Sequence, residues 1–237
     1  MNKEVFPNVD RLVLKAAEKI AQWIQETIEE RGRCCLCVAG GSTFLPIYEY
    51  LVETYEEDLD WEKVFIFWGD ERAVSIMHPD SNVAMVFDTF LNEVPIPAAN
   101  INIIQGAREP NDAAQHYEKE LRAFFSENEG MDILLLGLGD DGHTASLFPE
   151  TEALEQADRW VYYVEKDGVR HSRITLTAPF LNRSQKTLFV AYGGKKAGAV
   201  KEVLEGERNP SKFPAQLIRP RSGEVSWFLD EKAARDL

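Results

Sequence analysis

The chain has 237 residues, of which 44% are hydrophobic, which is enough for the core of one large α/β domain or of two small ones. Its net charge of −14 argues against nucleic acids and anionic membranes as partners, and no apolar run is long enough to span a bilayer. The first residues lack the pattern of a signal peptide, so we expect a cytoplasmic protein. An anionic substrate would need a local cluster of arginine and lysine to offset this charge.

The first predicted element is a helix from about Val9 to Glu30, where apolar residues recur at helical spacing until Gly32 ends the pattern. A strand from Cys34 to Val38 follows. Its three cysteines alternate between the two faces of the strand, and no second Cys/His pair stands nearby to complete a metal site. We therefore interpret the cysteines as reduced, buried thiols.

This strand runs into a glycine-rich loop, Ala39-Gly40-Gly41-Ser42-Thr43, which precedes a helical pattern from Phe44 to about Tyr55. Gly41 allows backbone N–H groups to point inward, Ser42 and Thr43 can donate hydrogen bonds, and the helix dipole favours negative charge. The same residues are also ordinary helix N-caps, so the stretch alone does not decide between an anion site and a cap. It lacks the Gly-Lys-Ser/Thr ending of a P-loop, which disfavours nucleoside triphosphates.

A second buried strand, Val64 to Trp68, ends in the charged run Gly69-Asp70-Glu71-Arg72. Such runs are usually solvated surface, but the carboxyl end of a buried strand is where open α/β sheets place their sites. A loop then leads to Ser81, which can cap a helix from Asn82 to Leu91. A short strand from Ile101 to Ile104 and a helix from Pro110 to about Phe125 complete the first half.

Four consecutive aliphatic residues, Ile133 to Leu136, predict a strand buried on both faces. The strand runs into Gly137-Leu138-Gly139-Asp140-Asp141-Gly142-His143, which matches the dinucleotide fingerprint by its letters. We reject NAD binding because Asp140 and Asp141 would repel a pyrophosphate. His143 could simply be a core or capping histidine, but a carboxylate two residues away can fix its tautomer and favours a functional role.

The remaining chain alternates in the same way. We expect strands at Trp160 to Val164, Arg173 to Thr177, Thr187 to Tyr192 and Val225 to Leu229, a helical turn that begins at Ala178, and a short C-terminal helix from Asp230. Phe213 to Arg219 is a short apolar run after a loop. Gly193-Gly194-Lys195-Lys196 opens a further helix that runs to about Leu204. Lysines oppose the dipole at a helix N-terminus, so an anion explains Lys195 and Lys196 better than helix stability does.

Strands and helices alternate throughout, and no linker, repeat or shift in composition divides the chain. We therefore predict an α/β fold: a doubly wound, mostly parallel, Rossmann-like sheet with helices on both faces, formed by a single domain over residues 1–237.

Taken together, the loops resemble those of the 6-phosphogluconolactonase family, which forms one superfamily with the glucosamine-6-phosphate deaminases/isomerases. The matching segments occur in family order over nearly the whole chain: Ala39 to Thr43, Gly69 to Arg72 with Ser81-Asn82, Gly139 to Pro149, Arg173 to Thr177, and Gly194 to Ala197. The deaminases carry a catalytic glutamate near position 148. Phe148 stands there in this chain, which favours the lactonase. Departures at Ala39, Ser75 and Glu150 remove no group that we assign to chemistry.

The resemblance implies hydrolysis of 6-phospho-D-glucono-1,5-lactone to 6-phospho-D-gluconate, the second step of the oxidative pentose phosphate pathway, with no metal and no cofactor. In this hypothesis His143 activates the water and returns the proton, and either Asp141 or Asp70 supports it. The predicted substrate-binding residues are Gly41, Ser42, Thr43, Glu71, Arg72, Gly142, Arg173, Lys195 and Lys196.

Two alternatives stay open. One is an amino-sugar phosphate deaminase/isomerase with the same fold. The other is a non-catalytic domain that senses a sugar phosphate, although the acidic chain shows no helix-turn-helix segment that would join it to DNA. The sequence leaves the oligomeric state, monomer or homodimer, open.

Overall fold

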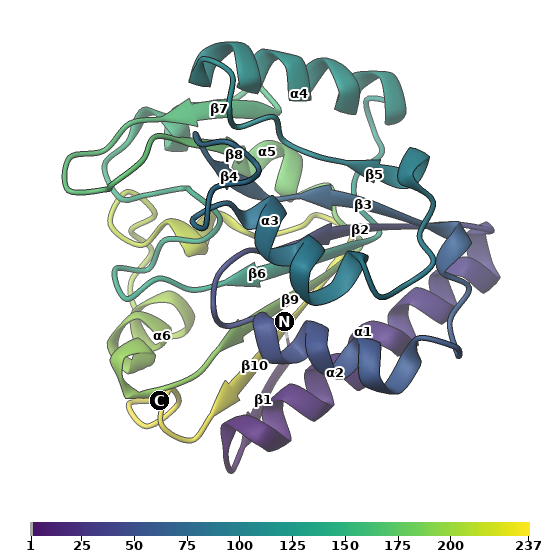
Figure 1. The fold of residues 1–237 in the computed structure, drawn as a ribbon. Coiled ribbons are helices and arrows are strands. Elements are labelled where there is room, and N and C mark those ends of the chain that lie inside the picture. Colours follow the sequence, from purple (N-terminus) through teal and green to yellow (C-terminus); the bar gives the residue numbers. More distant parts are fainter. Residues whose placement is uncertain (1) are drawn as a thin grey trace.

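The computed structural model describes residues 2–237, which form a seven-stranded sheet and a second sheet of three strands (Figure 1). The strands are β1 (Asn2–Phe6), β2 (Cys34–Val38), β3 (Val64–Trp68), β4 (Asp70–Arg72), β5 (Ile101–Asn102), β6 (Ile133–Gly137), β7 (Val161–Val164), β8 (Arg173–Leu176), β9 (Lys186–Ala191) and β10 (Glu224–Asp230).

The α-helices are α1 (Val9–Arg31), α2 (Leu45–Tyr55), α3 (Asn82–Val86), α4 (Pro110–Phe124), α5 (Ala178–Leu181) and α6 (Ala197–Leu204). A π-helical turn, Phe87–Leu91, continues α3. Short 3₁₀ segments occur at Trp61–Lys63, Ala98–Asn100, Glu152–Glu155, Gly194–Lys196 and Pro214–Leu217. Within residues 2–237, no helix has both the length and the apolar composition needed to cross a membrane.

Every pairing in the large sheet is parallel, and the strand order is β1-β10-β9-β6-β2-β3-β5. From β2 the chain first adds β3 and β5 on one side and later returns to place β6 on the other. The boundary between β2 and β6 is therefore the switch point of the sheet, where open α/β folds bind ligands at the carboxyl ends of the strands.

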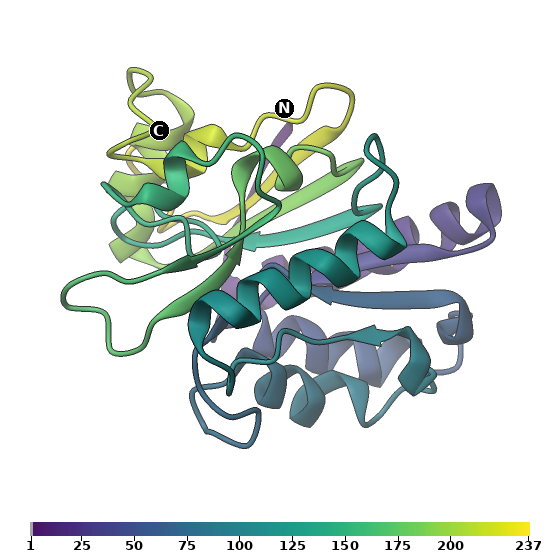
Figure 2. The same cartoon turned by 90° about the horizontal axis from the view of Figure 1, so that it is seen from above.

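Helices cover both faces of the large sheet (Figures 1 and 2). On one face α1 packs against α2, and α2 packs against the turn that follows α3. On the other face lie α4 and the small sheet β4-β8-β7, with α4 in contact with β7 and β8. Phe124 at the end of α4 stacks edge-on against Phe67 of β3, with ring centroids 5.1 Å apart. The prediction of a doubly wound, mostly parallel α/β fold is thus confirmed.

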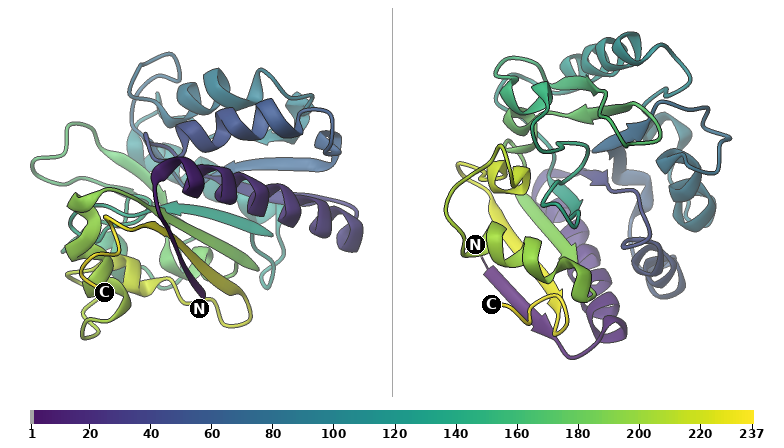
Figure 3. Two further views of the ribbon diagram at one scale, coloured as in Figure 1. Left: turned by 90° about the horizontal axis from the view of Figure 1, so that it is seen from below. Right: turned by 90° about the vertical axis from the view of Figure 1, so that its left-hand side faces the viewer.

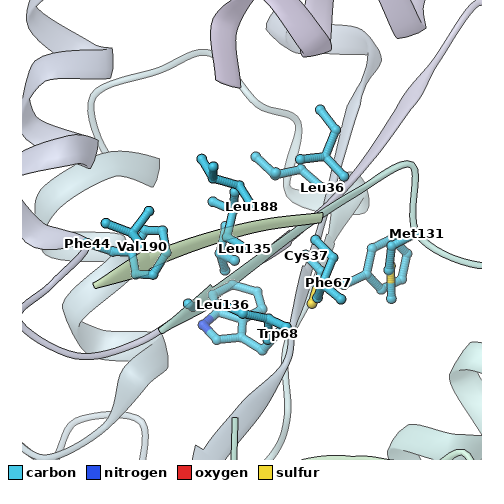
Figure 4. Packing of buried hydrophobic residues seen from close by; sticks show 14 of the residues in the cluster. Leu36, Cys37, Phe44, Phe67, Trp68, Met131, Leu135, Leu136, Leu188 and Val190 are labelled. Atoms are coloured by element: carbon cyan, nitrogen blue, oxygen red, sulfur yellow. The ribbon is translucent and has the colours of Figure 1, made fainter. Parts of the chain in front are cut away.

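The core runs through the central strands (Figure 4). Leu36 of β2, Leu135 of β6 and Leu188 of β9 lie together on one face of the sheet, and all three are fully buried. The aliphatic run of β6 is buried on both faces, as its sequence predicts. The three cysteines of β2 are buried and free, in agreement with their interpretation as core thiols.

The sequence patterns located most elements to within one or two residues, but three differ. The strand β1 was not predicted, because it is an edge strand whose first four residues are exposed and show no apolar alternation; it lies beside β10 (Figure 3). The run Asp70–Arg72 is a strand rather than a loop, paired antiparallel with β8. The predicted C-terminal helix is wrong: after β10 the Asp230 carboxylate accepts a hydrogen bond from the Ala233 N–H (2.8 Å), and only turns follow.

Candidate active site

A cleft of about 500 Å³ opens at the switch point of the large sheet, where the strands β2, β3 and β6 end. Its walls come from the segments that follow these strands and from the small sheet. The predicted site residues that line it are Gly41, Ser42, Thr43, Asp70, Arg72, His143, Arg173 and Lys196. Segments distant in the sequence therefore meet at one place, as expected for the carboxyl edge of a parallel sheet.

The loop after β2 forms one wall. Its start is held by the buried Tyr48 hydroxyl, which accepts a hydrogen bond from the Ala39 N–H (3.0 Å) and donates one to the Ala39 carbonyl (2.8 Å). Gly41 has φ of +88°, a conformation that favours glycine. The helix α2 is capped by Phe44 with no side-chain hydrogen bond, so Ser42 and Thr43 are not its N-cap. The capping interpretation is therefore wrong, and the anion-binding interpretation remains.

The loop after β6 carries the imidazole of His143. Its Nδ1 lies 2.5 Å from the Asp141 Oδ1, and the His143 backbone N–H donates to the same oxygen at 3.2 Å. This hydrogen bond from the imidazole lowers the pKa of the Asp141 carboxyl to about 2. The carboxylate is thus ionised at neutral pH and favours the tautomer with the proton on Nδ1, which leaves Nε2 free to accept a proton. His143 lines the cleft whereas Asp141 does not, so Asp141 supports the ring from behind.

Two glycines make this carboxylate–imidazole pair possible. A Cβ on Gly139 would lie 2.1 Å from His143 Nδ1 and 2.7 Å from Asp141 Oδ1, so any side chain there would displace the pair. Gly142 has φ of +79°, and its Cβ would meet the Phe213 ring at 2.8 Å. Gly142 does not line the cleft, contrary to its predicted role in substrate binding. It shapes the turn instead.

Asp70 reaches the cleft from β4 but has different partners. Its Oδ2 accepts a hydrogen bond from the Ser146 hydroxyl at 2.5 Å, and the Asn82 amide donates to its backbone carbonyl at 2.9 Å and to its Oδ1 at 3.3 Å. Asp141 is therefore the partner of His143, which answers the question that the sequence left open. Asp70 lies in the cleft as a second carboxylate that orients Ser146 and Asn82.

Basic side chains gather on the wall formed by the small sheet. Arg72 and Arg173 are direct cross-strand neighbours in the β4–β8 pair, and both line the cleft together with Arg170. Like charges directly opposite each other destabilise a sheet unless something compensates them. Burial, and then the charge of Arg72, lower the pKa of Arg173. An anion bound here would relieve both effects, so the cleft supplies the local positive charge that a chain of net charge −14 needs.

Lys196 adds a further cation to the lining of the cleft. Its Nζ lies 2.6 Å from the Asp140 Oδ1, and its side chain is 25% exposed. This contact ties the segment after β9 to the loop after β6. Lys195, its neighbour, is exposed and does not line the cleft, so its predicted contact with substrate is not supported.

Glu71 is the clearest correction among the predicted site residues. Its side chain is fully buried and does not line the cleft. Its carboxylate accepts hydrogen bonds from the Ser81 hydroxyl (2.8 Å) and from the backbone N–H groups of Asn82 (2.8 Å) and Val83 (2.7 Å). Side chains alternate along a strand, so Glu71 points away from its neighbours Asp70 and Arg72. Its carboxylate accepts hydrogen bonds from backbone N–H groups at the start of α3.

Among the polar residues that line the cleft, sequence reasoning did not assign Arg170 or Asn82 to the site. Arg170 lies in the connection between β7 and β8, with no strand end or glycine loop before it to mark it. Asn82 was predicted to start a helix and belonged to a segment that resembles the family, but it was given no role in the site. It is 2% exposed, and its Oδ1 has no hydrogen-bond partner among residues 2–237. Because Asn82 follows the serine that caps α3, nothing in the local sequence indicated that its side chain faces Asp70.

Comparisons with known proteins agree with this arrangement. A sequence model of the family described as "Glucosamine-6-phosphate isomerases/6-phosphogluconolactonase" matches residues 7–227. The chain is 42% identical to a 6-phosphogluconolactonase of Synechocystis sp., over 99% of this chain and 97% of the relative, and 39% identical to one of Nostoc sp. over the same shares. The crystal structure of a 6-phosphogluconolactonase from Thermotoga maritima superposes with a TM-score of 0.84 at 28% identity, over 97% of this chain and 99% of that one.

Proposed function

The chain belongs to the family of glucosamine-6-phosphate isomerases and 6-phosphogluconolactonases, and we propose that it hydrolyses 6-phospho-D-glucono-1,5-lactone to 6-phospho-D-gluconate in the oxidative pentose phosphate pathway. One observation carries the proposal: the carboxylate-supported imidazole of His143 opens into a cleft that is also lined by Arg72, Arg173 and Lys196. An ester hydrolase that acts on a phosphorylated sugar needs this combination of a base and a local positive charge.

In the proposed mechanism the His143 Nε2 takes a proton from a water molecule as that water attacks the lactone carbonyl. Asp141 stabilises the resulting imidazolium, because its carboxylate is ionised and already accepts a hydrogen bond from the Nδ1–H group. The tetrahedral intermediate then collapses, the bond from the former carbonyl carbon to the ring oxygen breaks, and the imidazolium returns its proton to that oxygen. Arg72 stabilises the developing oxyanion.

The phosphate is held at the other side of the cleft. Ser42, Thr43 and the backbone N–H groups of their loop lie at the N-terminal end of α2, and Lys196 provides the positive charge. Arg173 contacts either the phosphate or the sugar oxygens. Binding the phosphate far from the reacting carbon orients the lactone with respect to His143, so its binding energy contributes to the rate as well as to affinity.

The apolar residue at position 148 separates this function from that of the deaminases. The Phe148 ring lies 4.6 Å from the imidazole of His143, between ring centroids, and supplies no group that could transfer a proton. The net charge of −14 disfavours nucleic acids and anionic membranes as partners. We also propose a cytoplasmic location.

A direct assay of lactone hydrolysis tests the proposal. The purified chain should accelerate opening of 6-phosphogluconolactone above the spontaneous rate measured in the same buffer, and it should turn over unphosphorylated gluconolactone poorly. Ammonia release from glucosamine 6-phosphate is measured in parallel. Release of ammonia without lactone hydrolysis would establish the deaminase instead, and no turnover of either substrate would favour a sugar-phosphate-sensing domain.

A further inference from the structure

A second group of polar side chains lies at the rim of the cleft, outside the proposed catalytic machinery. His78 and Asp80 belong to the loop between β4 and α3, and His171 belongs to the connection between β7 and β8. Within residues 2–237 these three form the one group of histidine, cysteine and acidic side chains whose potential ligand atoms all lie within 4.8 Å of one another. The sequence spacing alone predicted no metal ligands, because His171 is contributed from a distant segment.

We propose that His78, Asp80 and His171 form a binding site for a divalent transition-metal ion of the zinc class. Two imidazoles and one carboxylate are ligands that Zn²⁺ accepts, and three protein ligands leave a fourth position for water. The site is distinct from lactone hydrolysis, since none of the three residues takes part in the proposed mechanism.

The distances suit such an ion. In a tetrahedral zinc site with bonds of about 2.0–2.1 Å, neighbouring ligand atoms lie about 3.3 Å apart. The His171 Nε2 is 2.8 Å from the Asp80 Oδ2, and the His78 Nδ1 is 3.9 Å from the same oxygen. Small side-chain rotations therefore bring all three atoms to coordination distance. The side chains are between 20% and 33% exposed, so an ion can enter from solvent while the loops hold its ligands.

Binding would displace three existing contacts, of which one is the hydrogen bond between the His171 Nε2 and the Asp80 Oδ2. The Arg170 guanidinium lies 2.9 Å from the Asp80 Oδ2, and the Asp80 backbone N–H donates to the His78 Nδ1 at 3.0 Å. Arg170 is 74% exposed, so its ion pair contributes little and its guanidinium can return to water. Asp80 also accepts a hydrogen bond from Arg72 at its backbone carbonyl. An ion at Asp80 would thus join the connection that carries Arg170 to the loop whose backbone accepts a hydrogen bond from Arg72.

The test is a zinc titration of the untagged, chelator-treated chain by isothermal calorimetry, with the melting temperature measured in parallel. We expect one Zn²⁺ per chain and a higher Tm with zinc, because an ion that binds only the folded state stabilises it. His171→Ala and Asp80→Asn should each weaken binding by at least about tenfold, since even the loss of an outer-shell partner weakens metal sites by that much. His116→Ala removes a similar surface pair, with Glu120 at 3.3 Å on α4, and should leave zinc binding unchanged.

The absence of saturable zinc binding to the wild-type chain would overturn the proposal. Zinc binding that persists in His171→Ala but is lost in His143→Ala would overturn it too, because the ion would then sit in the active site. Circular dichroism confirms that each variant is folded. A visible absorption spectrum of the wild-type chain loaded with Co²⁺ tests the site without any substitution. The absorption of a four-coordinate ion with nitrogen and oxygen ligands would support the site, and the spectrum of the hydrated ion would contradict it.

Discussion

The loops after β2 and β6 begin alike and end differently. Both follow buried parallel strands at the switch point, and both contain two glycines, which are adjacent only in the loop after β2. The loop after β2 carries only hydroxyl side chains and backbone, with Gly41 at positive φ and the start of α2 behind it. The loop after β6 folds back on itself so that Asp141 holds His143 at 2.5 Å.

This difference separates two tasks within one cleft. Backbone N–H groups and hydroxyls bind an anion without a titrating group, which suits a phosphate that must stay unchanged. A carboxylate–imidazole pair exchanges protons, which suits the reacting carbon. If the comparison is right, substitutions in the loop after β6 lower kcat, whereas substitutions around the loop after β2 raise KM for the phosphorylated substrate.

The largest effect is expected for His143→Ala, which removes the proposed base. Its kcat for 6-phosphogluconolactone should fall by about 10²–10⁴-fold, with a smaller change in KM. Steady-state rates corrected for spontaneous opening of the lactone measure this loss. An unchanged kcat in a folded variant would show that the loop after β6 is not the reacting side.

Gly139→Ala tests the geometry of the pair without removing either member. The new Cβ would lie 2.1 Å from the His143 Nδ1, so the ring and the Asp141 carboxylate must move apart. We expect kcat to fall by about 10²-fold, because displacements near 1 Å in a catalytic group have effects of that size. The matched control is Gly198→Ala on α6, where a Cβ meets no atom within 4 Å; it should keep full activity.

Asp141→Asn should lower kcat by about 10–100-fold, since the amide no longer fixes the imidazole tautomer or stabilises its charged form. Stability offers a second readout. Because the hydrogen bond from His143 lowers the Asp141 pKa to about 2, from an ordinary value of 3.8, the ionised carboxylate stabilises the fold above about pH 4. This contribution disappears as the pH falls through 2.

Urea unfolding of wild type and Asp141→Asn at several pH values between 2 and 6 therefore gives a difference in free energy that shrinks toward acid. A difference that stays constant or grows over this range would argue against the ion pair.

The smallest effect on the reaction is expected for Lys196→Met. Loss of a charge-assisted hydrogen bond to the phosphate should raise KM for the phosphorylated lactone by about tenfold and leave the slow turnover of unphosphorylated gluconolactone nearly unchanged. Lys195→Met is the matched control, because that side chain is exposed and outside the cleft. Equal losses on both lactones would place Lys196 on the reacting side instead.

Several features were readable from the sequence because they depend on neighbours along the chain. The aliphatic run of β6, the amphipathic helix α1 and the glycine that ends it all express local periodicity or backbone preference. The loops that reach the cleft were also predictable, since each follows a buried strand. His143 and Asp141 are two residues apart, so the sequence predicted that either Asp141 or Asp70 would support the imidazole.

Other features required the tertiary structure, because they depend on which distant segments meet. Asp70 and Glu71 are adjacent acidic residues, yet one faces the cleft and the other is buried beneath α3, since β4 pairs with β8 and its side chains alternate. The same pairing places Arg72 opposite Arg173, and His171 beside Asp80. The sequence by itself determined most of the strands and helices and the chemistry of the loops, but not the edge strand β1 or the strand β4. Only the tertiary structure decided which charged side chains line the same wall of the cleft, because long-range strand pairing leaves no local periodicity in the chain.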